Sequence, residues 1–210
     1  MNTPVCDFLR AYAEKSATRL HMPGHKGIGG ESERLDLTEI DGADSLYSAS
    51  GIIKESEENA GTLFGANTFY STEGSSHSIR AMLYLVSLYA KSQGQKPYVL
   101  AGRNAHKSFL SACALSNVEI DWIYPEDSEG YISCKVTAER LKEYFNSTTT
   151  LPCAVYLTSP DYLGNVTELD QISCVCKDNV VLLLVDNAHG SYLKFLENSM
   201  HPIDHGADMC

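Results

Sequence analysis

The sequence has little positive charge and no run that is rich in Lys or Arg. Its 210 residues hold 16 Lys and Arg against 27 Asp and Glu, which gives a formal net charge of −11. Proteins that bind nucleic acid or acidic membranes usually present a basic patch, so we expect neither partner here. The hydrophobic fraction of 43% and the charged fraction of 20% are typical of an ordinary globular protein.

Long apolar runs and a paired cysteine pattern are also missing. No stretch approaches the ~20 apolar residues of a membrane span, and the start of the chain lacks the basic and apolar regions of a signal peptide. The seven cysteines are odd in number and scattered along the chain. This pattern favours buried thiols in a reducing compartment over a disulfide framework. We therefore expect a cytoplasmic protein.

Repeats and low-complexity tracts are absent, and from residue 97 short apolar runs alternate with helical patterns. This alternation indicates an α/β fold, with a mostly parallel sheet and helices on both faces. We expect strands at 97–101, 118–124, 153–158 and 180–185, and helices up to about 116, at 137–145 and at 168–177. Earlier helices are expected at 3–16, 52–64 and 79–94, the first with Thr3 as its N-cap and Pro4 at its first position.

The last apolar run ends in Asp186, which is followed by His189 and Gly190. A run rich in β-branched residues and bounded by turn residues is typical of a strand buried on both faces of a parallel sheet. Charge just past the C-terminal end of such a strand lies where open α/β sheets bind ligands. The alternative is that Asp186 only caps the following turn, and this strand alone does not decide between them.

A second polar motif, Gly74-Ser75-Ser76, precedes the helix expected at 79–94. Free amides, hydroxyls and the positive end of the helix dipole together suit a phosphate. Ordinary N-capping by serine explains the motif equally simply. Both interpretations stay open for this motif alone.

Polar clusters follow three of the expected strands, at 103–108, 158–162 and 186–189. Successive parallel strands bring their C-terminal ends to one edge of the sheet, so these clusters are expected to converge with Gly74-Ser75-Ser76. An aspartate, two histidines and a phosphate cradle around one crevice predict a cofactor site. By contrast, His21 and His25 are separated by Pro23 and Gly24, which disfavours a helical zinc pair, and we predict no metal site.

Six ordered motifs resemble one known family. They are His-Met-Pro-Gly-His-Lys-Gly at 21–27, Asp-Gly-Ala-Asp-Ser-Leu at 41–46, Thr-Glu-Gly-Ser-Ser at 72–76, Arg-Asn-Ala-His-Lys-Ser at 103–108, Thr-Ser-Pro-Asp-Tyr-Leu-Gly at 158–164 and Asp-Asn-Ala-His-Gly at 186–190. Over about residues 18–210 the chain resembles the Orn/Lys/Arg decarboxylases, which use pyridoxal 5'-phosphate (PLP) and have the aspartate-aminotransferase-type fold. It looks like the short members without an N-terminal wing domain. The resemblance implies an N-terminal helix at 1–20 and an incomplete PLP-binding large domain at 21–210, without the C-terminal small domain.

The resemblance also implies roles for individual residues. Gly74, Ser75 and Ser76 would bind the cofactor phosphate, and His106 would stack on the pyridine ring. Asp186 would pair with the ring nitrogen and keep it protonated, which improves the ring as an electron sink. The remaining roles are contacts near the ring or the substrate: His189 beside the phenolic oxygen, Thr158 and Asp161 lining the site, and His21, His25 and Lys26 bordering it near a subunit interface.

The implied reaction is decarboxylation of arginine, lysine or ornithine, in a homodimer or larger homo-oligomer with a role in polyamine biosynthesis. There are two alternatives. The chain could belong to an enzyme that catalyses another PLP reaction, such as aminotransfer, or it could be a non-catalytic remnant that binds a partner. In the family, the Schiff-base lysine lies in a Ser-x-His-Lys motif after the aspartate strand, and this chain holds no such motif after Asp186. Lys107 imitates it but belongs to the earlier histidine motif. We therefore expect the 210 residues alone to be inactive.

Overall fold

The computed structural model describes residues 2–15, 17–22, 24–125 and 132–210. The chain divides into two compact units, Met1–Tyr70 and Ser71–Cys210. The first helix packs within the first unit, against the helix at 52–64. The division after residue 20 that the family resemblance implies stays a prediction. The sequence also predicts an acidic loop at 125–132, after the strand expected at 118–124, and this loop falls largely outside the described residues.

The first unit holds helices α1 (Pro4–Glu14), α2 (Glu31–Leu35) and α3 (Ile52–Phe64) and the 3-10 helix η1 (Leu46–Ser48). Helix α1 begins at Pro4, as predicted. The Thr3 side chain, however, accepts no cap bond from the backbone of the helix; its hydroxyl and the Thr3 N–H both donate to the carboxylate of Asp7, at 3.0 Å each. The first turn of α1 is therefore closed by a carboxylate that reaches back, and not by the expected threonine cap.

Asp44 closes the start of α3 in the same unit. Its Oδ2 accepts the backbone N–H groups of Gly51 (2.8 Å) and Ile53 (2.9 Å), and its Oδ1 accepts that of Ser50 (3.0 Å). These bonds, led by the one from Ser50, hold the pKa of the Asp44 carboxyl well below its usual range. Capping of α3 is therefore the structural role of Asp44 within the motif at 41–46.

The second unit is built on a parallel four-stranded sheet with the order β2-β1-β3-β4. The fold class predicted from the sequence is therefore confirmed. The strands are β1 (Tyr98–Gly102), β2 (Glu119–Ile123), β3 (Ala154–Thr158) and β4 (Leu182–Asp186). The α-helices of this unit are α4 (Ser75–Ser92), α5 (Lys107–Ser116), α6 (Ala138–Ser147) and α7 (Leu169–Asp178). Two 3-10 helices follow β4, η2 (Ser191–Phe195) and η3 (Pro202–His205), and neither was predicted.

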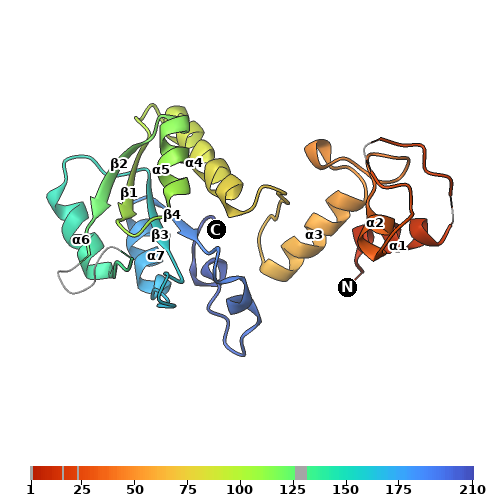
Figure 1. The fold of residues 1–210 in the computed structure, drawn as a ribbon. Helices are drawn as coiled ribbons and strands as arrows, with labels where there is room; N and C mark the ends of the chain where they lie inside the picture. The colour runs from red at the N-terminus through yellow and green to blue at the C-terminus, as the bar shows by residue number, and fades with distance from the viewer. Residues whose placement is uncertain (1, 16, 23, 126–131) are drawn as a thin grey trace. The chain divides into compact units, whose positions relative to one another are not determined.

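Helices cover both faces of the sheet, as Figure 1 shows. Alternate strand residues enter two separate hydrophobic cores: Leu183 and Val185 pack with the α6 and α7 residues, while Leu184 packs with those of α4 and α5. Burial on both sides explains why the strands read as continuous apolar runs. In the described part of the chain, no helix is long and apolar enough to cross a membrane.

The register of the sheet decides which side chains reach its C-terminal edge. Tyr156 pairs with Leu184 and Thr158 with Asp186, so these four residues lie on the face covered by α4 and α5. Helix α4 buries Ile79, Met82, Leu83, Val86 and Ala90 against this face, at helical spacing. The N-terminal ends of α4 and α5 thereby come to the same side of the sheet as Asp186.

Candidate functional site

A cavity of about 100 Å³ lies at the C-terminal edge of the sheet. It is lined by Ser75, His106, Thr158, Pro160, Tyr162, Asp186, Ala188 and His189. The chain leaves β1 toward β2 on one side and returns to β3 on the other, so the strand order reverses between β1 and β3. Open α/β sheets bind their ligands at such a reversal. The structure thus brings together five residues that the sequence predicted for one site: Ser75, His106, Thr158, Asp186 and His189.

Asp186 is the buried charge of this cavity, with 6% of its surface exposed. Its Oδ2 accepts the hydroxyl of Tyr156 at 3.1 Å, and its Oδ1 accepts the N–H of Ala188 at 3.2 Å. Among the described residues, no Lys, Arg or His forms an ion pair with it. A buried carboxylate without a counter-ion is costly, and a bound cation would offset that cost.

Tyr156 supports Asp186 and was missed by the sequence prediction. It is fully buried on β3, and its ring stacks on Phe109 with the centroids 4.2 Å apart. Burial, and then the charge of Asp186, raise the pKa of the Tyr156 hydroxyl, which therefore stays a neutral donor. The sequence carried one signal: Tyr156 and Thr158 are two residues apart, so both project from the same face of the strand.

Gly74, Ser75 and Ser76 form the start of α4. Gly74 has φ +68° and ψ −171°, a conformation that is essentially restricted to glycine. This turn leaves the first amides of α4 without intrahelical partners, as at any helix start. The Ser76 hydroxyl lies 2.7 Å from that of Ser108 on α5, so the starts of the two helices are joined by a hydrogen bond.

His106 is the N-cap of α5. Its Nδ1 accepts the N–H of Ser108 at 3.2 Å and lies 2.8 Å from the Ser108 hydroxyl. Because Nδ1 accepts, the proton of the neutral ring lies on Nε2. The predicted stacking residue is thus held by the first turn of the helix that follows it.

Thr158 and His189 complete the cavity. Within the described ranges, the Thr158 hydroxyl is buried and has no hydrogen-bond partner. A buried hydroxyl without a partner is costly, so a ligand that bonds to it would be favoured. The exposed His189 ring makes an edge contact with Tyr162, with the centroids 5.5 Å apart.

Asp161 does not line this cavity. Its Oδ1 accepts the N–H groups of Leu163 and Asn165, and its Oδ2 accepts the Asn165 amide and the Ser133 hydroxyl. Burial alone would raise the pKa of the Asp161 carboxyl, but these bonds lower it on balance. Asp161 thus holds its own loop, and the contact with a cofactor expected for it has no support in this geometry.

His21, His25 and Lys26 lie in the first unit. The His25 Nδ1 lies 2.7 Å from the Asp36 carboxylate, and Lys26 donates to the carbonyl of His21. Their expected place beside the active site stays a prediction.

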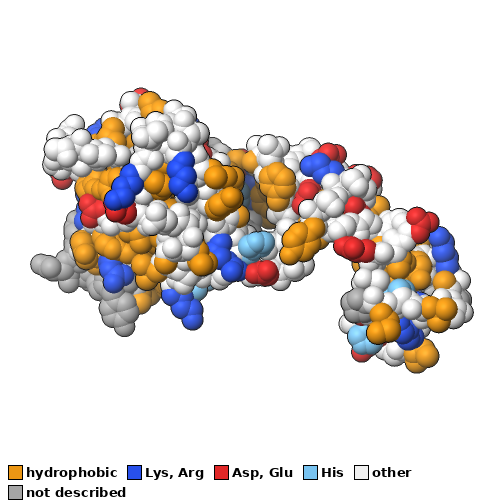
Figure 2. Space-filling view, turned by 90° about the horizontal axis from the view of Figure 1, so that it is seen from above, with side chains coloured by type: hydrophobic (Ala, Val, Ile, Leu, Met, Phe, Trp, Pro, Cys, Tyr) orange, Lys and Arg blue, Asp and Glu red, His pale blue; other side chains and the backbone are white. Residues whose placement is uncertain are grey.

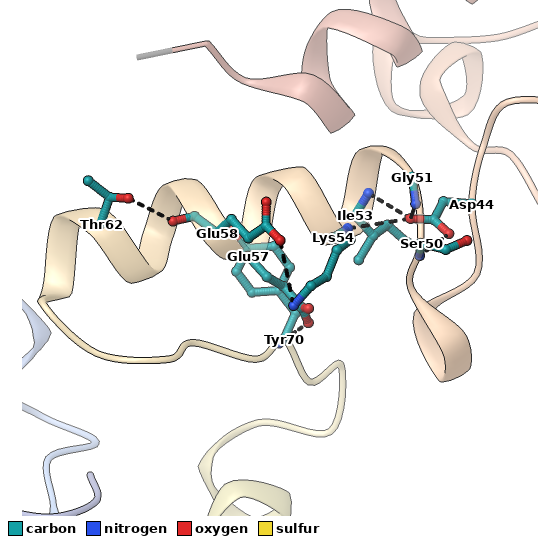
Figure 3. Close-up of polar contacts among 9 residues, drawn as sticks. All are labelled: Asp44, Ser50, Gly51, Ile53, Lys54, Glu57, Glu58, Thr62 and Tyr70. Carbon is teal, nitrogen blue, oxygen red and sulfur yellow. Dashed lines mark hydrogen bonds and ion pairs between the residues drawn. The ribbon is translucent and has the colours of Figure 1, made fainter.

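A larger cavity, of about 610 Å³, lies in the first unit between α3 and the segment after it. Lys54 and Glu57 line it, and the buried Glu57 accepts the N–H of Tyr70 at 2.9 Å (Figure 3). The same view shows Asp44 at the start of α3. No residue that the sequence predicted for the site lines this larger cavity, and we place the candidate site at the sheet edge.

The sheet-edge cavity has two electrostatic poles. Asp186 is a buried anion, whereas the starts of α4 and α5 present amides, hydroxyls and the positive ends of two helix dipoles. The half-buried His106 lines the same cavity as Asp186 and as Ser75 at the start of α4. Such a site suits a flat ligand with a cationic nitrogen at one end and a phosphate at the other.

Comparison with known proteins agrees with this geometry. The family model described as "Orn/Lys/Arg decarboxylase, major domain" matches residues 3–208. The arginine decarboxylase of Halalkalibacterium halodurans is 32% identical over 221 residues, covering 99% of this chain and 44% of that protein. That of Bacillus subtilis is 31% identical over 223 residues, with the same coverage. The chain therefore spans less than half the length of these relatives.

Solved structures show the same fold. Lysine decarboxylase A from Pseudomonas aeruginosa superposes with a TM-score of 0.76 at 20% identity, covering 98% of this chain and 30% of that one. Mouse CSAD in its apo form gives a TM-score of 0.57 at 19% identity, over 74% of this chain and 36% of that one. Because this family model matches residues 3–208, nearly the whole chain, the chain belongs to the Orn/Lys/Arg decarboxylase family.

Proposed function

We propose that these 210 residues form the PLP-binding part of a decarboxylase that acts on a basic amino acid. One observation carries the proposal: the buried Asp186 has no ion-pair partner in the described part of the chain and shares a cavity with the start of α4. PLP offers a ring nitrogen that can be cationic and a phosphate, which match the two poles. Family membership supports the reaction, and the rice protein TDC, which has the same fold (TM-score 0.53, 18% identity, 64% of this chain and 32% of that one), was solved with PLP.

The proposed roles follow from the contacts. The start of α4, with Gly74, Ser75 and Ser76, holds the phosphate through its amides and dipole. Asp186 keeps the ring nitrogen protonated, since its carboxylate is buried and oriented by Tyr156. Thr158 donates its unpartnered hydroxyl to the ligand.

When bound, PLP supplies an electron sink for the electron pair left on Cα after the carboxylate departs as CO₂. Two histidines, His106 and His189, line the same cavity. His106 carries its ring proton on Nε2, because Nδ1 accepts from Ser108. His189 lines the more exposed side of the cavity, where an incoming amino acid has access.

A basic amino acid as substrate and a homo-oligomer as the working form are part of the same proposal. The relatives are named arginine decarboxylases, which supports the substrate class. Large hydrophobic side chains are exposed in the first unit, including Met22, Tyr47 and Phe69, and hydrophobic groups are visible on the face drawn in Figure 2. Light scattering of the full natural protein tests the oligomer, which a monomer at micromolar concentration would contradict.

Covalent attachment of PLP is not expected in these 210 residues. Lys107 is exposed at the first position of α5 and does not line the cavity. We expect borohydride reduction of the chain with PLP to leave no stoichiometric pyridoxyl group on Lys107. A single full adduct there, with turnover, would contradict this.

The decarboxylase activity is tested with the full natural protein. Release of labelled CO₂ from carboxyl-labelled arginine, lysine and ornithine is measured with PLP present, and with Asp186→Asn as the inactive control. We expect release from at least one of the three. Transfer of the amino group without CO₂ would favour an aminotransferase instead, and no reaction with any of them would favour a non-catalytic binding role.

A further inference from the structure

Ser108 connects two parts of the candidate site that the sequence treated separately. Its hydroxyl lies 2.8 Å from the His106 Nδ1 and 2.7 Å from the Ser76 hydroxyl. Only 8% of Ser108 is exposed. The three side chains form one hydrogen-bonded row from the phosphate-binding start of α4 to the ring-stacking histidine.

We propose that Ser108 is a positioning residue, which fixes the His106 ring and couples its hydrogen bonding to phosphate binding at Ser76. The proposal rests on the proposed PLP site and adds a residue to it. Ser108 itself does not line the cavity. It acts through its two neighbours.

The row has two possible directions, because a serine hydroxyl has one proton to donate. In the first, Ser76 donates to Ser108, and Ser108 donates to the His106 Nδ1. In the second, Ser108 donates to Ser76, and the His106 Nδ1 accepts a hydrogen bond only from the backbone N–H of Ser108, at 3.2 Å. Rotation about two C–O bonds interconverts them, so no covalent bond changes.

A phosphate selects the second direction. Phosphate oxygens accept hydrogen bonds, so a Ser76 hydroxyl that contacts one donates its proton to it. To remain bonded to Ser76, Ser108 must then donate to it and withdraw its proton from His106. Occupation of the phosphate position is thereby communicated to the ring of His106, which keeps its Nε2 proton in both states.

The experiment compares Ser108→Ala with Ser111→Ala. Ser111 is the matched control, since it lies on the same helix, is exposed, and donates only to the Lys107 carbonyl in its own turn. PLP affinity of the 210-residue chain is measured by titration, with the circular dichroism of the bound chromophore as a second signal. We expect Ser108→Ala to weaken binding about 3- to 10-fold and to alter the chromophore signal, and Ser111→Ala to change neither. Equal affinity and equal signal in both variants would overturn the proposal.

Nitrogen-15 NMR of the histidine rings measures the hydrogen bonding of the His106 Nδ1 directly. We expect the Nδ1 shift of His106 to move when inorganic phosphate saturates the wild-type chain, and to be insensitive to phosphate in Ser108→Ala. The same response in both proteins would also overturn the coupling. Ser108→Cys keeps a weak donor of similar size, so partial recovery of the phosphate response is expected; it also serves if Ser108→Ala fails to fold.

The two proposals fail differently. A wild-type chain that binds no PLP rejects the proposed function, while the phosphate response of His106 still decides the role of Ser108. A wild-type chain that binds PLP, with Ser108→Ala indistinguishable from it, rejects only the role of Ser108.

Discussion

At the scale of single residues, the site depends on a carboxylate held by neutral groups. Tyr156 and the Ala188 amide each occupy one oxygen of Asp186, and neither neutralises its charge. The remaining acceptor capacity of the carboxylate is therefore available to a ligand cation. A charged acceptor in a buried place binds such a cation far better than an amide does.

Asp186→Asn removes the charge and keeps a side chain of the same shape. Hydrogen bonds to charged groups contribute roughly 1.5–3 kcal/mol, so we expect PLP to bind about 10- to 100-fold more weakly. Equilibrium titration followed by the absorbance of PLP measures the change. Asp178→Asn, at the exposed end of α7, is the control and should bind as the wild type does. Unchanged affinity in Asp186→Asn would remove Asp186 from the site.

Gly190 fits where no larger residue does. A Cβ at this position would lie 2.5 Å from Cδ of Pro160 and would also collide with the Asn187 amide. Overpacking of this kind costs typically 1–3 kcal/mol, and we expect Gly190→Ala to lower the free energy of unfolding by that amount in urea. In Gly30→Ala the new Cβ meets only the end of the partly exposed Glu33 side chain, so this variant should lose far less. Equal stability of the two variants would contradict this packing.

The residues of the site were predictable to different degrees. Asp186, His106 and Thr158 follow expected strands, where topology alone brings polar groups together. Tyr156 and Ser108 act through partners 30 and 32 residues away in the sequence. Their roles depend on strand register and helix packing, which no local pattern encodes. Asp161, a polar residue after a strand, bonds to its own loop, and its expected place in the lining of the site stays a prediction.

At the scale of elements, the capping of α3 gives a structural role to Asp44 in the motif at 41–46. Asp44 has φ +65° and accepts several amides at the helix start. In Asp44→Asn an NH₂ group replaces one acceptor oxygen, so we expect faster amide hydrogen exchange in the first turn of α3. Asp41→Asn, on an exposed residue of the same loop, is the control. Equal protection of this turn in the wild type and in Asp44→Asn would contradict the capping role.

His205 links η3 to α7 and gives the stability a pH dependence. Its bond to the Ser199 carbonyl, and then its pairing with Asp170 at 2.9 Å, raise the pKa of His205. A raised folded pKa means that the stabilisation is fully present below the unfolded pKa of ~6.5 and is lost as pH rises through the folded value. Asp170 is largely exposed, so solvent screening limits the effect to below about 1 kcal/mol.

The matching variant is His205→Asn, measured by urea unfolding at pH 6 and at pH 8.5. We expect the wild type to exceed the variant in stability by more at pH 6 than at pH 8.5. A difference that is equal at both pH values, or larger at pH 8.5, would show that the protonated ring does not stabilise this contact.

Helices and strands were predicted well where buried apolar residues recur at a regular spacing along the sequence. Helix α3 has the predicted bounds, and each strand lies within about two residues of its expected range. The short elements were missed, namely α2 (Glu31–Leu35) and the 3-10 helices η1, η2 and η3. They span five residues or fewer, which is too short for a hydrophobic period to show. Residues 208 and 209 also pair with β4, through bonds such as Val185 N–H to the Met209 carbonyl.

At the scale of the whole molecule, the second unit alone carries the candidate cofactor site. All residues that line the sheet-edge cavity belong to Ser71–Cys210, whereas His21, His25 and Lys26 belong to Met1–Tyr70. The second unit has its own sheet and two cores. PLP binding is therefore expected to depend on the contacts of this unit.

The most direct measurement is a crystal structure of the chain with PLP bound. We expect one PLP in the sheet-edge cavity, with its phosphate against the first turn of α4 at Ser75 and Ser76. Its ring nitrogen should lie within hydrogen-bonding distance of Asp186, with the His106 ring against its face. PLP bound elsewhere, for example in the larger cavity beside Lys54 or as an adduct on Lys107, would contradict the assignment, as would a ring turned with its nitrogen away from Asp186.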